Sequence, residues 1–399
     1  MIRDPAALLA VLTGIAALFF HLERRTGWRL FQYCPPLLFI YALPVVLNNT
    51  GVIPAQSGVY DGLRRYGLPF FLTILLLDVD VRAAFRIMGR GVFVMLMGTL
   101  GVVVGAPVAY LFVHRFLDPD AWKGYGALAG SWIGGTGNMA AVAEGLGTSG
   151  EMFGLAVLAD NAVYLVWLPL LLASRSWAGK FARFTGVAHA ERMEALEAAA
   201  DRLPEKGRVV EMRHVVTLAF LGFAVTWISV DGGEAIADWL VAILPPRLLE
   251  NLPVVSATSL TVLLVTTFGI ALSATPARTI PGSHELAMAV VYLFVAVMGA
   301  RASVEGFGQA VPFVLGAFVW ICIHGGFCLL GARWFRVDVH TAAIASAANI
   351  GGAASAPVVA GFHNRKLVPV SILMALIGYA VGNYAAFLAA QLTFLAGKT

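Results

Sequence analysis

Long apolar stretches follow one another along most of this 399-residue chain, and they constrain its fold more than any other feature. A helix that crosses the hydrocarbon core of a bilayer needs about 20 mostly apolar residues. Stretches of this kind cover 5–21, 33–50, 66–80, 91–114, 125–146, 150–174, 213–231, 254–275, 285–300, 309–331, 341–361 and 368–396. Because backbone groups in lipid must be satisfied within the protein, we expect an all-α polytopic membrane protein.

The composition excludes most other classes of protein. Hydrophobic residues make up 59% of the chain and charged residues 13%, against about 45–50% and about 25% in soluble domains. A soluble fold cannot bury so much apolar surface, so most soluble enzymes, nucleic-acid binders and secreted disulfide scaffolds are excluded. The net charge of +4 fits the Lys/Arg excess of cytoplasmic loops and requires no nucleic-acid partner. We expect a multi-pass protein of the plasma (inner) membrane.

One long polar stretch, Arg175 to Arg213, interrupts this pattern. Its middle, from Ala188 to Arg202, combines good helix formers with interleaved Glu and Arg, which predicts a linker helix on the membrane surface. The alternative is a docking or regulatory segment. The chain then divides into a peripheral N-terminal span (1–32), a first repeat (33–174), the polar linker helix (175–212), one or more connecting spans (213–253) and a second repeat (254–396).

An internal repeat is the strongest local signal. The block IGGTGNMAAVA at 133–143 recurs as IGGAASAPVVA at 350–360, so that Gly134-Gly135 corresponds to Gly351-Gly352. Long apolar spans precede and follow both blocks. Paired hydrophobic segments that glycine interrupts at matching positions of two halves point to the binding site of a secondary transporter.

A Gly-Gly pair lets a helix unwind because it has no Cβ that would clash. We therefore expect helical geometry to be interrupted near 133–138 and 350–355. Freed carbonyl groups can then coordinate a cation, and an exposed helix N-terminus can face an anion. Pro357 favours a break because it removes a backbone donor within the second block. The alternative is close helix packing through small residues.

The relative orientation of the two halves does not follow directly from the sequence. Six spans separate equivalent points, which would make the halves parallel, whereas inverted halves need an odd number. We prefer inversion, and we therefore expect the short apolar stretch 234–246, which Pro245-Pro246 ends, to cross the membrane as well.

Asp160 lies ten residues into the span 150–174 and should be near the bilayer midplane. A carboxylate at that depth costs about 2.5–3.5 kcal/mol on insertion scales, and such residues usually mark an ion or proton path. Asn161 supplies an oxygen that suits a hard cation. The alternative for Asp160 is a neutral, hydrogen-bonded structural role. The predicted ion-binding residues are Asp160, Asn161, Gly134, Gly135, Thr136, Gly351 and Gly352.

Other polar side chains lie in or near the glycine blocks. Ser355 stands at the position equivalent to Asn138, and Tyr379 and Asn383, four residues apart, share one helix face. Glu144 follows the first block and is a candidate gating residue. The three cysteines and the histidines show no metal-ligand spacing, so we expect no transition-metal site and no cofactor besides Na⁺ or H⁺ as coupling ion. The candidate substrate-binding residues are Ser131, Asn138, Asn349, Ser355, Tyr379 and Asn383.

With the blocks GSWIGGTGNMAAVAEGLG (130–147) and AANIGGAASAPVVAG (347–361), the chain resembles the YjcL-like family of uncharacterised membrane proteins over most of its length. That family is grouped with the bile acid/sodium symporter and cation–proton antiporter superfamily. The resemblance implies two inverted five-span repeats with crossed broken helices, plus extra peripheral spans. The broken helices would lie in a mobile core beside a scaffold or dimerisation panel, so we expect a homodimer.

Carried over by position, the resemblance implies that Thr136, Asn138, Asn349 and Ser355 line the crossing. Asp160-Asn161 falls where antiporters of this superfamily carry an acidic pair or an Asn-Asp pair. Here the order is reversed, and no lysine stands in the equivalent span of the second half. This departure weakens the case for antiport and favours sodium-coupled symport.

Together these features predict an ion-coupled secondary transporter of a small, anionic organic solute that works by alternating access. One alternative is a cation/proton antiporter. A second is an intramembrane enzyme or receptor, which would need a Ser/His pair or a metal-ligand cluster at membrane depth. Because the sequence shows no such constellation, we expect no enzymatic activity.

Overall fold

The computed structural model describes residues 1–28, 30–33, 35–187, 209–303 and 308–398, and the regular structure in these ranges is helical. Most of the predicted linker helix lies outside the described residues. The elements before the linker are α1 (Pro5–Thr26), α3 (Pro36–Asn49), α4 (Gly58–Gly62), the π-helix η1 (Leu63–Gly67), α5 (Leu68–Leu77), α6 (Val81–Met88), α7 (Arg90–Val113), α8 (Ala121–Gly145), α9 (Gly150–Ala173) and α10 (Ala178–Thr185). Those after it are α12 (Met212–Ile243), α14 (Ala257–Ser273), α15 (Ser283–Ala300), α16 (Ala310–Phe335), α17 (Val339–Asn349), α18 (Gly352–His363) and α19 (Val368–Ala396).

Local sequence signals set where several of these helices begin. The side chains of Asp4, Ser149, Ser256 and Asp338 accept hydrogen bonds from the backbone N–H three residues further on, at the starts of α1, α9, α14 and α17. Such caps satisfy donors that the first turn of a helix leaves free. In the described part of the chain, seven helices are long and apolar enough to cross a membrane, and α3 and α14 are shorter apolar helices.

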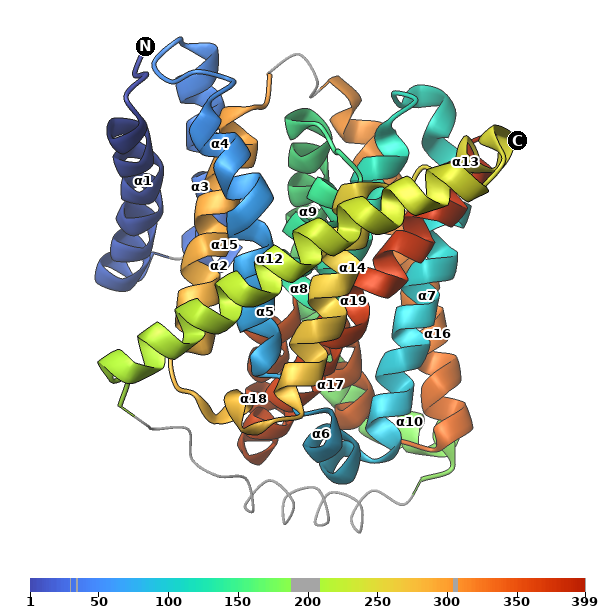
Figure 1. Ribbon diagram of the computed structural model, residues 1–399. Helices are drawn as coiled ribbons and strands as arrows, with labels where there is room; N and C mark the ends of the chain where they lie inside the picture. The colour runs from blue at the N-terminus through green and yellow to red at the C-terminus, as the bar shows by residue number, and fades with distance from the viewer. Residues whose placement is uncertain (29, 34, 188–208, 304–307, 399) are drawn as a thin grey trace.

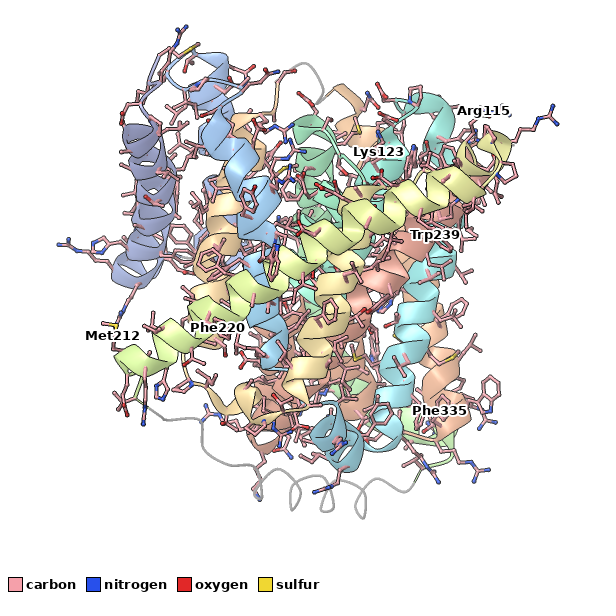
Figure 2. All side chains as sticks on the ribbon, viewed as in Figure 1. Arg115, Lys123, Met212, Phe220, Trp239 and Phe335 are labelled. Carbon is pink, nitrogen blue, oxygen red and sulfur yellow. The ribbon has the colours of Figure 1, made fainter. Side chains whose placement is uncertain are left out.

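The helices form two groups that lie side by side (Figure 1). We call α1, α3, α4–η1–α5, α12, α14 and α15 the panel, since they pack mainly on one another. We call α7, α8, α9, α16, α17, α18 and α19 the core, within which α8 packs on α19 and α7 on α16. α12 runs diagonally across the panel, from Met212 to Trp239 at the opposite end (Figure 2). Its outer side exposes large apolar residues such as Phe220 and Trp239, as expected of a lipid-facing helix.

α8 doubles back on itself at Gly135, where the backbone leaves helical geometry. A straight helix would separate residues 126 and 146 by about 30 Å. In the structure, a Cβ built on Gly126 would lie 2.5 Å from Cδ1 of Leu146, and one on Gly130 would lie 2.8 Å from the Asn138 carbonyl oxygen. Residues 121–145 are therefore two antiparallel arms, which we call hairpin 1.

α17 and α18 form the equivalent arrangement, hairpin 2 (339–363). Its arms reverse between Asn349 and Gly352, and a 2.7 Å hydrogen bond joins Nδ1 of His340 to Nδ1 of His363 where the arms meet α16 and α19. Hairpin 1 opens toward the end of the molecule that carries Lys123, and hairpin 2 toward the opposite end, near Phe335 (Figure 2).

These hairpins bear on two of the sequence predictions. The interruptions expected near 133–138 and 350–355 are confirmed. The expectation that the broken helices cross one another is wrong, because each chain segment returns to the end from which it came. The separate crossing expected for 234–246 is also wrong, since residues up to Ile243 continue α12 without a break.

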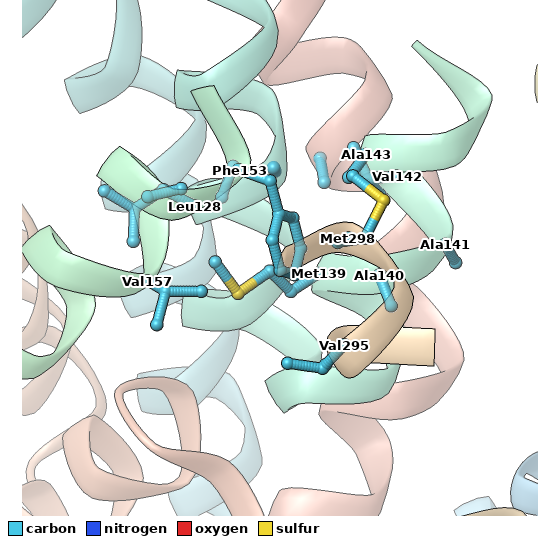
Figure 3. Close-up of a cluster of buried hydrophobic side chains, with 14 of the residues drawn as sticks. Leu128, Met139, Ala140, Ala141, Val142, Ala143, Phe153, Val157, Val295 and Met298 are labelled. Carbon is cyan, nitrogen blue, oxygen red and sulfur yellow. The ribbon is translucent and has the colours of Figure 1, made fainter. Parts of the chain in front are cut away.

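Apolar side chains fix hairpin 1 to its neighbours (Figure 3). Met139 of the second arm lies in one cluster with Phe153 and Val157 of α9 and with Val295 and Met298 of α15, and all five are essentially inaccessible to solvent. The second arm is thus held between the core and the panel.

Candidate functional site

The tips of the two hairpins meet in the interior of the molecule. Gly135 has a φ of 72°, and Gly351 and Gly352 have φ of 91° and 57°. These left-handed values favour glycine at all three positions, whereas Gly134 is required by packing, since a Cβ there would overlap the Asn138 amide. A Cβ on Gly352 would lie 3.6 Å from Cα of Gly135, so the two tips are in contact. The glycines that the sequence singled out are therefore neighbours, although 217 residues separate the blocks.

α19 passes directly against the tip of hairpin 1. A methyl group added at Gly378 would overlap the Ile133 carbonyl group, and one added at Gly382 would overlap the Asn138 amide. The Asn138 Nδ2 donates a hydrogen bond of 3.1 Å to the Tyr379 carbonyl oxygen. The small residues of α19 thus allow a close approach that a side chain would prevent.

Asn383, one turn after Tyr379, connects α19 to the panel. Its Nδ2 donates a 2.8 Å hydrogen bond to Oγ1 of Thr266 on α14. Asn138 and Asn383 are both completely buried. Sequence reasoning missed Thr266, because nothing in its apolar span distinguishes it from a threonine whose hydroxyl group bonds only to the backbone of its own helix.

Asp160 fixes α9 to the first arm of hairpin 1. Its two carboxylate oxygens accept hydrogen bonds of 2.9 Å from Ser131 Oγ and from the Trp132 indole Nε1. Asn161 turns away, since its Nδ2 donates to the Val157 carbonyl of its own helix at 2.7 Å. The structure therefore gives both Asp160 oxygens protein partners, and Trp132 is a partner that the sequence did not identify.

Hairpin 2 has its own polar contacts near the tip. Ser355 and the Tyr164 ring of α9 both lie beside Gly351, where an added Cβ would meet each of them, and Asn349 is joined to Thr99 Oγ1 of α7 by a 2.9 Å hydrogen bond. Asn349 is completely buried, whereas Tyr164 is partly exposed. The structure brings Ser355 and Asn349 to the same hairpin but places them beside different helices.

A buried histidine lies beneath hairpin 2. The ring nitrogens of His324 lie 3.0 Å from the Gly98 carbonyl oxygen and 3.0 Å from Ser346 Oγ, and Ser346 also accepts a 3.0 Å hydrogen bond from Trp167 Nε1. His324 lies inside α16 at zero exposure.

Glu144 lies at the open end of hairpin 1, where it pairs with the panel. Nε of Arg64 donates to both Glu144 oxygens at 2.7 Å, and Nη2 lies 2.6 Å from Oε1. Glu144 is only 6% exposed. Both residues line a cavity of about 270 Å³ together with Arg65 and Glu234, which form a second ion pair. Arg64 lies 80 residues from Glu144, so no local pattern indicated the pair.

Exposure separates the predicted site residues into two sets. Thr136, Asp160, Asn161 and Gly351 are partly exposed around the hairpin tips. The second set is buried and comprises Ser131, Gly134, Gly135, Asn138, Asn349, Gly352, Ser355, Tyr379 and Asn383.

Comparisons with known proteins agree on the class of this chain. Residues 10–395 match the model of a family described as "Protein of unknown function (DUF819)". The chain is also similar to the "Uncharacterized membrane protein YjcL" of Bacillus subtilis (strain 168), with 27% identity over 379 residues that cover 92% of each protein.

Proposed function

Because the chain belongs to the DUF819 family and is a multi-pass membrane protein, we propose that it is an ion-coupled secondary transporter of a small, anionic organic solute. We place it in the plasma (inner) membrane. The observation that carries the proposal is the meeting of two hairpins, from opposite ends of the molecule, at tips of non-helical backbone. Such backbone at membrane depth is tolerated only where protein buries it or where it lines a cavity.

Helix directions favour inverted repeats. A hairpin returns to its own side, so the crossing helices before the linker are α1, α3, α5, α7 and α9, and those after it are α12, α14, α15, α16 and α19. Five crossings are an odd number, so the second half starts at the end opposite to the first. α1 and α12 indeed begin at opposite ends in Figure 1. The proposed repeats thus need no crossing by 234–246.

The chemistry of the tips favours an anion. The second arm of each hairpin begins at the tip, so two helix N-termini point to the same central region. A helix N-terminus carries a partial positive charge and free N–H groups, which stabilise negative groups. We propose that the solute binds here, beside Thr136, Asn161, Tyr164 and Gly351.

Alternating access would follow from movement of the core against the panel. Hairpin 1 touches the panel through the Arg64–Glu144 ion pair, so this pair is a candidate for the gating role predicted for Glu144. The panel would serve as scaffold and as the contact of a homodimer. Transport rather than catalysis remains our proposal for all these residues.

A cation/proton antiporter is the second candidate, and the Asp160 carboxylate, partly exposed beside the tips, is the observation that favours it. Membership of the bile acid/sodium symporter superfamily is a further proposal. Hairpins in place of crossed broken helices weigh against that relationship.

Labelling of a cysteine at the tip tests the proposal without knowledge of the solute. In a variant without native cysteines, Thr136→Cys should react with a membrane-impermeant maleimide from either side of proteoliposomes, while the vesicles stay impermeable to small ions. Met139→Cys, which is fully buried in the same hairpin, is the control and should not react. Absence of reaction from both sides, or ion leakage through an open pore, would contradict alternating access.

A further inference from the structure

Two buried amides beside the tip of hairpin 1 keep an acceptor oxygen without a partner. Oδ1 of Asn138 and Oδ1 of Asn383 have no hydrogen-bond donor among the described residues. Both side chains have zero exposure. A buried acceptor left without a partner costs about 1–3 kcal/mol, so each of these oxygens requires an explanation.

The surroundings fix which end of each amide is free. Asn138 faces the Tyr379 carbonyl group, which can only accept, so Nδ2 must point there. Asn383 faces Thr266, whose hydroxyl group already donates to the Val262 carbonyl at 2.7 Å, so Nδ2 must point there as well. Turning the Asn138 amide would place two acceptors against each other, and turning the Asn383 amide would require the Thr266 hydroxyl group to give up its bond to the Val262 carbonyl. The free atoms are therefore oxygens.

The two amides contact the same turn of α19. Tyr379 and Asn383 are one turn apart on one face, and the Asn138 amide lies against Gly382 as well as the Tyr379 carbonyl. A Cβ at Gly382 would also lie only 3.1 Å from Cα of Gly134. The Asn138 amide thus lies where hairpin 1, close to its tip, is packed on α19, and Asn383, which follows Gly382 in the chain, lies at the adjoining contact of α19 with α14.

The chemistry of these oxygens selects a monovalent cation. Amide oxygens are hard, neutral ligands that suit ions such as Na⁺, whereas Ca²⁺ sites rely on carboxylates. An amide does not take up a proton at neutral pH, so this pair cannot serve a proton-coupled cycle. The Asp160 carboxylate is engaged with Ser131 and Trp132.

We propose that Asn138 and Asn383 bind a Na⁺ ion between hairpin 1 and α19, as the coupling-ion site of the proposed transport function. The site differs from the predicted one at Asp160 and Asn161, and it gives to an ion two residues that the sequence assigned to the solute. Because both side chains are buried, the ion holds the tip of hairpin 1 against α19. A cation there also favours a solute anion at the adjacent tips.

The test is the apparent melting temperature of the purified full-length protein against NaCl, with choline chloride keeping ionic strength constant. A ligand that binds the native state raises this temperature as its concentration passes its Kd. We expect a Na⁺-specific rise in the wild type that Asn138→Leu and Asn383→Leu weaken at least tenfold in apparent Kd. Gln391→Leu is the matched control, since Gln391 is also a buried amide on α19 with an unpaired oxygen, and it should keep the wild-type response within twofold.

Asn383→Asp provides a second variant that keeps the oxygens and the size of the side chain. It should bind Na⁺ more tightly and with a pH dependence that the wild type lacks. Equal melting temperatures in NaCl and choline chloride for wild type and Asn383→Asp would overturn the site and indicate that a water molecule satisfies the two oxygens. A Na⁺ response retained in both leucine variants would place the ion elsewhere.

Binding and transport can fail separately. Na⁺ binding that depends on Asn383, without alternating access of Thr136, would support this site and contradict the proposed transport. Alternating access together with proton-driven uptake and no Na⁺ response would support transport and overturn this site.

Discussion

Replacing Gly135 by alanine distinguishes a hairpin from a continuous helix. In a continuous helix, alanine would stabilise the protein by about 1 kcal/mol because it is the better helix former. In the structure, Gly135 has φ 72° and ψ −171°, a conformation that L-amino acids rarely adopt. We therefore expect Gly135→Ala to destabilise the protein, the opposite of what local propensity predicts.

The size of this effect follows from the local geometry. The new Cβ would lie 3.4 Å from Cε1 of Tyr379, which is an ordinary contact, so overlap contributes little. Backbone strain remains, at about 1–3 kcal/mol. For cooperative unfolding of 399 residues at about 2.1 cal/mol/K per residue, the melting temperature should fall by roughly 1–4 °C.

Thermal unfolding of the purified protein measures this change. Gly326→Ala is the matched control, because Gly326 lies within α16 and a Cβ there would meet nothing within 4 Å. That variant should gain about 1 kcal/mol from helix propensity. If both variants raised the melting temperature equally, residues 121–145 would be a continuous helix and the reasoning would be refuted.

Three further substitutions test contacts of the site by their effect on thermal unfolding. Asp160→Leu removes the acceptor of two buried donors and should lower the free energy of unfolding by about 1–3 kcal/mol for each. Asp160→Asn keeps one acceptor and should unfold near the wild-type temperature. Equal stability of the two variants would contradict the contacts with Ser131 and Trp132. Arg64→Leu leaves Glu144 buried and unpaired, which should lower the free energy of unfolding by about 3–5 kcal/mol. The double variant with Glu144→Leu should recover most of this loss. No recovery would argue against the Arg64–Glu144 ion pair. Gly378→Ala should be more destabilising than Gly361→Ala, since only the former meets a backbone oxygen, that of Ile133; a reversed order would exclude the close approach of α19.

The sequence by itself determined that the apolar segments form helices and that two of them are interrupted, at the matching glycine blocks. Runs of apolar residues predict helices because each backbone group in lipid needs a partner within its own segment. The paired glycines predicted the breaks at 133–138 and 350–355 because glycine alone adopts left-handed backbone at little cost. Both properties depend largely on neighbours along the chain, so the sequence carries most of the information about them.

Only the tertiary structure decided what the chain does after each break. A segment of 25 mostly apolar residues has the same composition whether it crosses a bilayer or returns halfway, and the contacts that select the return, such as Gly126 with Leu146, need both arms in place. The Gly232-Gly233 pair shows the converse. In sequence this pair looks like the glycine pairs that interrupt a helix. It lies, however, inside the continuous helix α12, where Gly233 permits close packing against Thr261.

The same reasoning applies to the site. The sequence identified Asp160, Asn138 and Asn383 as polar groups at membrane depth, because a polar residue in an apolar run is visible without a structure. It could not identify their partners Trp132, Tyr379 and Thr266, since a hydrogen bond between segments up to 241 residues apart leaves no local pattern. Whether a buried oxygen is satisfied or left free depends on those partners, and so the tertiary structure alone separates a structural amide from a candidate ion ligand.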